Sequence, residues 1–217
     1  MDLRLNGQTA IVTGASRGIG LAITRGLVAE GVHVTAGALK SSAELDELAG
    51  AGQVRVVEVD LAEPGGPTRL VAAAGDRIDI LVNNVGAAPA RPGGFGEIND
   101  EDWHASLTLN LMAAVRTTRA ALPVMLAAGK GAIVNISSAN AFLPDPAVMD
   151  YSPAKAALAS FSKSLSKEAG AASGSTRSAR ARSPPTCGSV TTGSPRRSAA
   201  RPAPGPRTSR ARPHTRW

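Results

Sequence analysis

The stretch Thr9-Ala-Ile-Val-Thr-Gly-Ala-Ser-Arg-Gly-Ile-Gly20 decides the fold. Its first five residues form an apolar, β-branched run that predicts a strand, and apolar residues then recur at helical spacing from Ile19 to Glu30. The same alternation continues along the chain. Strands are predicted over 9–13, 32–36, 54–59, 78–82 and 132–136, and helices over 19–30, 42–49, 68–74, 100–128 and 151–168. Because the strands are almost continuously apolar, they predict a parallel sheet covered on both faces, an α/β doubly wound (Rossmann) fold.

Two local signals refine these elements. Ser42 precedes the second predicted helix, and its hydroxyl is predicted to cap that helix. Pro123 lies inside the pattern over 100–128. Because proline lacks an N–H and clashes with the preceding turn, it is predicted to kink or divide the long helix.

The glycine-rich turn after the first strand suits a phosphate group. Gly14 permits a tight turn, Gly18 leaves room for backbone to approach a pyrophosphate, and Gly20 lets the helix pack close to the sheet. The helix N-terminus adds free N–H groups and partial positive charge. The spacing is G-x-x-x-G-x-G rather than the common G-x-G-x-x-G. We therefore predict a dinucleotide site, the alternative being a turn without ligand, with the residues Gly14, Ser16, Arg17, Gly18, Ile19 and Gly20.

The end of the second predicted strand bears on the choice of dinucleotide. An acidic residue there would bind the adenosine ribose 2′-hydroxyl and favour NAD. The chain instead reads Thr35-Ala-Gly-Ala-Leu-Lys40, without an acid. Arg17 and Lys40 are available to a 2′-phosphate, so the sequence favours NADP(H) over NAD(H) unless both cations are ordinary solvated side chains.

Tyr151 and Lys155 form the predicted reactive pair. Residues four apart share one helix face, so the two side chains project together. A nearby ammonium stabilises a phenolate, and such a tyrosine can exchange a proton with a carbonyl or alcohol oxygen. Alone, this spacing is more typical of a surface pair. The reactive interpretation gains support from polar residues that follow the fourth and fifth strands, where parallel sheets bind ligands, namely Asn83, Asn84, Ser137 and Ser138.

Taken together, these motifs resemble the short-chain dehydrogenase/reductase family. The segment 13–20 matches the family's T-G-x3-G-x-G, Asp60 follows the third strand, and the segment 83–86 matches N-N-A-G with Val85 in place of alanine. The family's tetrad is matched by Asn110, Ser138, Tyr151 and Lys155. The resemblance covers residues 5–168, about three quarters of the chain.

The resemblance implies a role for each matched residue. Tyr151 would be the acid/base, and Lys155 would bind the nicotinamide ribose and stabilise the phenolate. Ser138 would orient the reacting oxygen, and Asn110 would hold a proton-relay water. The cofactor would also be contacted by Asp60, Leu61, Asn84, Val85 and Gly86. In the family a hydride moves between nicotinamide and a carbonyl or carbinol carbon, which implies a small-molecule ketone reduced with NADPH. No residue is assigned to a metal.

The last part of the chain has a different composition. Residues 169–217 hold ten arginines and no acid, whereas residues 1–168 hold 14 basic and 17 acidic side chains. The tail lacks Leu, Ile, Phe and Met, so it cannot bury enough apolar area to offset ordering entropy, and disorder is predicted. We expect an incomplete dinucleotide-binding and catalytic domain over 1–168. The single cysteine, the lack of a membrane-length apolar run and the lack of a secretory signal favour a cytoplasmic protein.

Family members continue past this point with a sixth strand and a loop that touches the nicotinamide. Our hypothesis is that the tail is a frameshifted reading of that region. With permitted wobble bases, codons 171–195 can read RGIRVNAVSPGPVATDLWLGDDGVA, which contains the family's R-V-N-x-V-x-P-G-x-V-x-T pattern. Without a sixth strand the sheet lacks a neighbour. We therefore expect marginal stability, weak or absent turnover, and loss of an interface that the family's homo-oligomers use.

Three function classes remain open on the sequence alone. The first is an NADP(H)-dependent oxidoreductase that is impaired in this chain. The second is a nucleotide-binding scaffold or inactive relic without hydride transfer. The third is a nonspecific nucleic-acid binder acting through the basic tail, whose affinity would fall with salt. The third has little support, because Trp217 is the tail's one aromatic residue.

Overall fold

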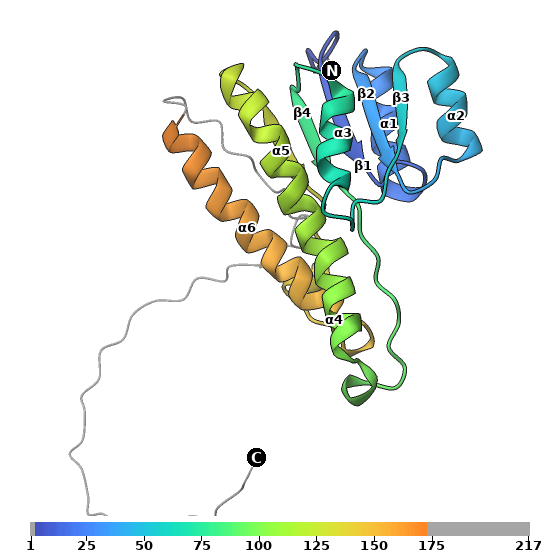
Figure 1. Cartoon of the computed structure of the whole chain (residues 1–217), viewed down its shortest axis with the longest axis vertical. Coiled ribbons are helices and arrows are strands. Elements are labelled where there is room, and N and C mark those ends of the chain that lie inside the picture. The colour runs from blue at the N-terminus through green and yellow to red at the C-terminus, as the bar shows by residue number, and fades with distance from the viewer. Residues whose placement is uncertain (1–2, 173–217) are drawn as a thin grey trace, which may run out of the picture. The chain divides into compact units, whose positions relative to one another are not determined.

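The computed structural model describes residues 3–172. Five parallel strands form one sheet in the order β3-β2-β1-β4-β5. Their bounds are β1 Thr9–Thr13, β2 His33–Ala38, β3 Val54–Glu58, β4 Ile80–Asn83 and β5 Ala132–Asn135. Strand order reverses at the β1/β4 pair, where Ile11 lies in register with Leu81. The predicted α/β doubly wound fold is therefore confirmed (Figure 1).

Six α-helices join or follow these strands in the described part of the chain. They are α1 Gly18–Ala29, α2 Ala43–Gly50, α3 Gly66–Ala74, α4 Asp100–Leu107, α5 Ala113–Ala127 and α6 Tyr151–Ala172. The Ser42 side chain accepts a hydrogen bond from the backbone N–H of Leu45, so the predicted cap of α2 is confirmed. Short 3₁₀ turns at Phe95–Glu97, Ala139–Ala141 and Pro146–Val148 shape the loops.

The segment predicted as one long helix is divided at a different place. Of the two predicted effects of Pro123, a kink or a division, the division is wrong, because α5 runs through this proline to Ala127. The division falls instead at a π-helical turn, η2 (Thr108–Met112), between α4 and α5. The wider π turn displaces its side chains from α-helical register, and such turns are frequent at functional sites. Asn110 lies at the centre of η2.

Apolar clusters cover both faces of the sheet. Successive residues of β1 point to opposite faces and so contribute to both clusters. One apolar cluster joins β1 to α1 and α2 and contains Val12, Leu21 and Leu45. The other joins β1 to α3 and α5 and contains Ile11, Leu70 and Met125. Figure 1 shows α3 and α5 side by side on this second face.

A buried polar ladder crosses the β4/β5 side of the sheet. The Asn83 Nδ2 donates to Asn135 Oδ1 at 2.9 Å and to Thr118 Oγ1 at 3.0 Å. The Asn135 Nδ2 donates in turn to Ser162 Oγ at 3.1 Å. These bonds tie β4 and β5 to α5 and to α6, the helix that also carries Tyr151 and Lys155.

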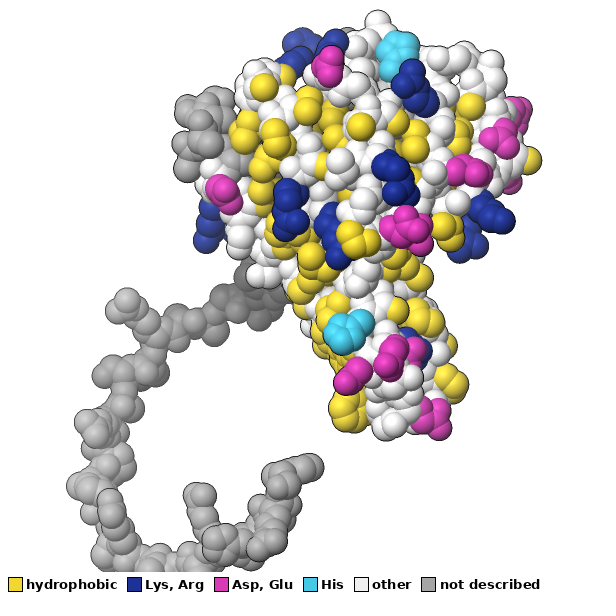
Figure 2. Space-filling model, in the orientation of Figure 1, with side chains coloured by type: hydrophobic (Ala, Val, Ile, Leu, Met, Phe, Trp, Pro, Cys, Tyr) yellow, Lys and Arg dark blue, Asp and Glu magenta, His cyan; other side chains and the backbone are white. Residues whose placement is uncertain are grey.

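The start of α4 is strongly acidic. Asn99 and Asp102 form a capping box, in which each side chain accepts a hydrogen bond from the other's backbone N–H. Figure 2 shows acidic side chains gathered over α4, consistent with the favourable position of carboxylates at a helix N-terminus.

Several predictions concern the C-terminal tail. The structure describes only residues 169–172 of it, as backbone at the end of α6. The predicted disorder, the nucleic-acid contact and the displaced reading frame therefore lie outside the described residues. In the part that is described, β5 pairs with β4 alone, and Val134 of β5 is 37% exposed. No helix between residues 3 and 172 has the length and apolar character to cross a membrane.

Candidate active site

A cavity of about 460 Å³ lies at the carboxyl ends of the strands, where the strand order reverses. Eleven predicted residues line it: Gly14, Ser16, Arg17, Ile19, Asp60, Leu61, Asn84, Val85, Gly86, Tyr151 and Lys155. The lining residues that the sequence analysis did not assign to the cofactor or the tetrad are Gly37, Ala38, Leu39, Val59, Ala87, Ala88, Leu109, Ile136 and Ser137. Five predicted residues are not among those that line it: Gly18, Gly20, Lys40, Asn110 and Ser138.

The turn after β1 has the backbone shape that a phosphate group requires. Gly14 and Gly18 adopt φ values of 65° and 56°, a region that favours glycine. A Cβ on Gly20 would lie 2.2 Å from the carbonyl oxygen of Gly14, so a side chain does not fit there. Arg17 occupies the N-cap of α1 without a side-chain hydrogen bond to the helix. The first turn of α1 therefore keeps amides for an anion, and the turn fits a pyrophosphate.

The end of β4 is bonded to this glycine turn. The Thr13 hydroxyl oxygen accepts hydrogen bonds from the N–H groups of Asn84 and Val85, at 2.8 and 3.0 Å. The Asn84 Nδ2 donates to the carbonyl oxygens of Thr13 and Gly14, at 2.9 and 3.0 Å. The Asn84 amide thus holds two walls of the cavity together. Sequence reasoning recognised Asn84 as a cavity residue but not this bonding role.

The end of β2 places no acid at the cavity. Leu39 lines the cavity and is 69% exposed, and Lys40 next to it is exposed and outside the lining. Arg17 does line the cavity. The Ser42 hydroxyl donates to the Ser16 carbonyl oxygen at 2.7 Å, which fixes the glycine turn against the start of α2. Of the two predicted cations, the structure therefore brings only Arg17 to the cavity wall.

Tyr151 and Lys155 both line this cavity and lie close together, as their helical spacing predicts. The Lys155 Nζ lies 5.7 Å from the centroid of the Tyr151 ring and donates to the Ile136 carbonyl oxygen at 3.0 Å. Lys155 is only 3% exposed, and desolvation lowers its pKa to about 8. The pair therefore combines a phenol with a buried amine that titrates close to neutral pH.

Asn110 lies just behind the cavity wall. Its Nδ2 donates to the carbonyl oxygens of Ala87 and Ser106, at 2.9 and 3.1 Å, and its Oδ1 accepts from the N–H of Ala87 at 3.0 Å. A Cβ on Gly86 would lie 2.8 Å from the Asn110 Oδ1 and 3.4 Å from the Lys155 Nζ. A glycine at this position therefore lets Asn110 and Lys155 approach the same backbone atom.

The two adjacent serines after β5 differ in their surroundings. The Ser138 hydroxyl accepts from the N–H of Asn140 at 3.2 Å and caps the 3₁₀ turn that follows. It also lies 3.4 Å from the Asn140 Oδ1, to which it can donate. Ser137 lines the cavity, and its buried hydroxyl has no hydrogen-bond partner among the described residues. The sequence analysis named both serines as polar residues after the fifth strand, and only the family resemblance selected Ser138.

The sequence analysis missed two charged residues that form an ion pair at the entry of α6. Arg91 lies in the connection after β4, and Asp150 directly precedes Tyr151. They form an ion pair of 2.7 Å across a separation of 59 residues. No periodicity or spacing rule links them, so only their side-chain geometry reveals the pair. Between residues 3 and 172, no group of three or more His, Cys, Asp or Glu side chains is placed to hold a metal ion.

The chain has relatives of known sequence. It is 36% identical over 173 residues to the uncharacterized oxidoreductase YvrD of Bacillus subtilis, an alignment that covers 77% of this chain and 65% of that protein. It is 36% identical over 172 residues to a 3-oxoacyl-[acyl-carrier-protein] reductase of Synechocystis, covering 76% and 69%. The chain thus spans somewhat less than two thirds of the length of the Bacillus relative.

Solved structures share the fold. A metagenomic short-chain oxidoreductase in complex with NADP is similar with a TM-score of 0.72 and 34% identity, covering 78% of both chains. A 3-oxoacyl (acyl-carrier-protein) reductase from Agrobacterium tumefaciens with NADP bound has a TM-score of 0.71 and 33% identity, covering 78% of this chain and 67% of that one. Residues 8–173 match the family model described as short chain dehydrogenase. The chain belongs to the short-chain dehydrogenase family.

Proposed function

We propose that this chain binds NADP(H) and reduces the carbonyl group of a small-molecule ketone to an alcohol. The observation that carries the proposal is the position of the Lys155 amine. Lys155 is 3% exposed, and its Nζ lies 3.0 Å from the Ile136 carbonyl oxygen and 5.7 Å from the centroid of the Tyr151 ring. This pair lies in one cavity with the glycine turn. A phenol and a cation in a cavity that can also take a dinucleotide suit hydride chemistry at a carbonyl group.

The cavity residues divide into those that would hold the two halves of the cofactor. The glycine turn and the first amides of α1 would bind the pyrophosphate, and Asp60 would contact the adenine. Asn84, Gly86 and Lys155 would line the nicotinamide half. When bound, the reduced nicotinamide supplies the hydride that the carbonyl carbon accepts.

The tetrad residues would transfer the proton that the oxygen of the reduced carbonyl group receives. Tyr151 would donate its hydroxyl proton to the oxygen of the reduced carbonyl, and the Lys155 ammonium would stabilise the phenolate that remains. The Ser138 hydroxyl, which now faces the Asn140 amide oxygen, would donate to the substrate oxygen instead and orient it. The Asn110 Oδ1 accepts one protein hydrogen bond and can accept a second, so it would hold a relay water beside Lys155.

The preference for NADP(H) rests on the cavity wall at the end of β2. Ala38 and Leu39 line that wall where an acid would be needed for the 2′-hydroxyl of NAD(H). Arg17 lines the same cavity and offers a guanidinium to a 2′-phosphate, with exposed Lys40 as a second cation. The NADP bound to the similar metagenomic and Agrobacterium proteins supports this assignment.

Thermal unfolding of the purified full chain tests the proposal. We expect a cooperative transition that NADPH raises more than NADH, by about 5–10 °C at a hundredfold excess over Kd. We also expect NADPH oxidation with a panel of ketones, at a low rate because β5 has no second neighbour in the described sheet. Tyr151→Phe should keep the thermal shift and lose the turnover. A shift without turnover in the wild type would favour the nucleotide-binding scaffold, and no shift would contradict both.

A further inference from the structure

We propose that Arg91 is a positioning residue. It holds Tyr151 and Asn110 in the positions that catalysis requires, and it acts through Asp150 and Ser106. The inference rests on the proposed function, because it assigns to Arg91 the support of two members of the proposed tetrad. Arg91 itself is absent from the cavity lining. Its effect must therefore pass through the residues that it bonds.

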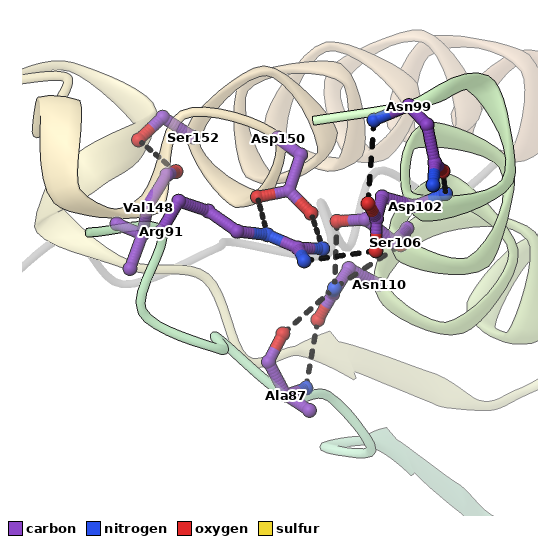
Figure 3. Close-up of polar contacts among 9 residues, drawn as sticks. All are labelled: Ala87, Arg91, Asn99, Asp102, Ser106, Asn110, Val148, Asp150 and Ser152. Atoms are coloured by element: carbon purple, nitrogen blue, oxygen red, sulfur yellow. Dashed lines mark hydrogen bonds and ion pairs between the residues drawn. The ribbon is translucent and has the colours of Figure 1, made fainter. Parts of the chain in front are cut away.

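The guanidinium of Arg91 is held between two carboxylates (Figure 3). Its Nη2 lies 2.7 Å from the Asp150 Oδ2, and its Nε donates to the Asp150 Oδ1 at 3.3 Å, a two-point contact. Its Nη1 donates to the Asp102 Oδ1 at 2.8 Å. Asp150 is fully buried and the Arg91 side chain is 19% exposed. A buried carboxylate needs a charged partner, so this ion pair determines where Asp150 can lie.

Asp150 transmits this constraint to Tyr151 directly. It is the residue before Tyr151, and α6 begins at Tyr151. The backbone N–H of Arg91 also donates to the Ala147 carbonyl oxygen at 2.8 Å, within the turn that leads into α6. The connection after β4 is therefore bonded to the entry of α6 by both backbone and side chain. Two such anchors fix the direction in which α6 starts, and with it the position of the Tyr151 ring.

Ser106 carries the constraint to Asn110. The Ser106 side chain hydrogen bonds to the Asp150 carboxylate, and the Ser106 carbonyl oxygen accepts from the Asn110 Nδ2 at 3.1 Å. Asn110 bonds both the N–H and the carbonyl of Ala87, which lies four residues before Arg91. The bonds and the intervening chain therefore link Arg91 to Asn110 by way of Asp150 and Ser106. Figure 3 shows the bonds of Arg91 to Asp150 and those of Asn110 to Ser106 and Ala87.

The same contacts argue against a direct role for Arg91 in binding an anionic substrate. The guanidinium of Arg91 already hydrogen bonds to two carboxylates, and their two negative charges exceed its single positive charge. Hydrogen bonding from Arg91 is the largest influence on Asp150 and holds the pKa of that carboxyl below its usual range. Asp150 is thus ionised at neutral pH, and removing Arg91 would leave a buried charge with Ser106 as its remaining side-chain partner.

The kinetic test compares Arg91→Met with Arg69→Met, which removes an arginine from the exposed Arg69–Glu63 ion pair. We expect Arg91→Met to lower kcat about ten- to a hundredfold, because small displacements of reacting groups are costly, while NADPH affinity stays at the wild-type value. Arg91→Lys keeps the charge but not the two-point contact, and should recover part of kcat. Unchanged kcat in Arg91→Met would overturn the proposal, and so would a loss confined to KM for an anionic substrate.

A second readout does not require turnover, so it separates this proposal from the proposed function. Tyr151 is the single tyrosine of the chain, and tyrosinate absorbance therefore reports on it alone. We expect the pH midpoint of that absorbance to move by about half a unit or more in Arg91→Met and to stay in place in Arg69→Met. Far-ultraviolet circular dichroism confirms that each variant is folded under the same conditions. A wild-type midpoint in a folded Arg91→Met protein would overturn the proposal, even if no ketone is reduced.

A double-mutant cycle checks the route through Asp150. Asp150→Asn keeps the shape of the side chain and removes its charge. If Arg91 acts through Asp150, the kcat of Arg91→Met/Asp150→Asn should be well above the product of the two single effects. Independent, multiplicative effects on kcat would show that Arg91 acts by another route and would contradict the proposal.

Discussion

The Nζ of Lys155 donates a hydrogen bond to the carbonyl oxygen of Ile136 at 3.0 Å, and this bond fixes the start of α6 to the residue that follows β5. The amine is almost completely buried by this contact and by the ring of Tyr151. The only polar partner of the amine in the described structure is a backbone carbonyl. Its charged form is therefore poorly compensated, which explains why its pKa falls to about 8.

The rate of ketone reduction is expected to depend on this titration. Below pH 8 Lys155 is protonated and can stabilise the phenolate, and above that pH it loses its proton, so kcat/KM should fall as the pH rises. Lys155→Arg should retain part of the activity and show the fall at a higher pH, because a guanidinium stays charged. The measurement is the pH profile of kcat/KM for both proteins. Identical profiles would show that another group controls the fall.

Two glycines of α1 offer a matched pair of variants. A Cβ on Gly20 would meet backbone atoms of Gly14 at 2.2 and 2.9 Å, so Gly20→Ala should displace the glycine turn and abolish the thermal shift produced by NADPH. Gly26 in the same helix has nothing within 4 Å of the added Cβ, and Gly26→Ala should raise stability by about 0.5–1 kcal/mol. Urea unfolding with and without NADPH measures both effects. NADPH binding by Gly20→Ala at wild-type affinity would refute the proposed pyrophosphate site.

Arg17 is expected to set the preference for NADPH over NADH. Arg17→Gln removes the cation that lines the cavity and should weaken NADPH binding about ten- to a hundredfold, while NADH binding changes little. Lys40→Gln is the comparison, since Lys40 is exposed and outside the lining, and its effect should be smaller. Fluorescence titration with each nucleotide gives the affinities. An equal loss for both nucleotides would argue that Arg17 does not read the 2′-phosphate.

The polar ladder across β4 and β5 should contribute measurably to stability. Within the described part of the chain, Asn135→Ala leaves the Asn83 Nδ2 with Thr118 as its only partner and leaves the buried Ser162 hydroxyl without a donor. We expect a loss of about 1–3 kcal/mol in the free energy of unfolding. Asn83→Ala/Asn135→Ala should lose less than the sum of the single variants, because the two amides share one bond. Additive losses in urea unfolding would show that the two residues act separately.

The displaced reading frame of the tail is a prediction about the gene. Sequencing around codons 165–170 should reveal a frame whose product over 171–195 contains the R-V-N-x-V-x-P-G-x-V-x-T pattern. A chain expressed with that frame restored should unfold at a higher temperature and reduce ketones faster, because β5, which pairs with β4 alone in the described sheet, would gain a second neighbour. A coding sequence without such a frame would refute the hypothesis that the tail is frameshifted.

The elements that could be predicted from the sequence are those whose signal is local. The first strand, the glycine turn and the Ser42 cap each depend on a few neighbouring residues, and all three lie where they were expected. The division of the long helix was placed wrongly, because proline is a visible signal whereas a π turn has none. At η2 the hydrogen bonds from Asn110 to Ala87 accompany the extra residue in the turn, and these bonds join segments 23 residues apart.

The same distinction separates the parts of the candidate site. Tyr151 and Lys155 are four positions apart on one helix, so helical geometry alone predicts that they share a face. The burial that lowers the pKa of Lys155 is absent from that geometry and comes from the packing of α6 against the end of β5. Likewise, two adjacent serines are equivalent in sequence, and only the folded chain turns Ser137 to the cavity and Ser138 to Asn140.

The sequence by itself determined the parallel α/β sheet, the glycine turn and the shared helix face of Tyr151 and Lys155, because strand pattern, helical spacing and turn chemistry act over short distances. Only the tertiary structure decided that Arg91 pairs with Asp150, that Asn83 pairs with Asn135, and that Arg17 rather than Lys40 reaches the cavity wall. These contacts join residues far apart in the chain. Their partners are selected by burial, since a charge or amide removed from water must find a hydrogen-bonding group wherever the fold places one.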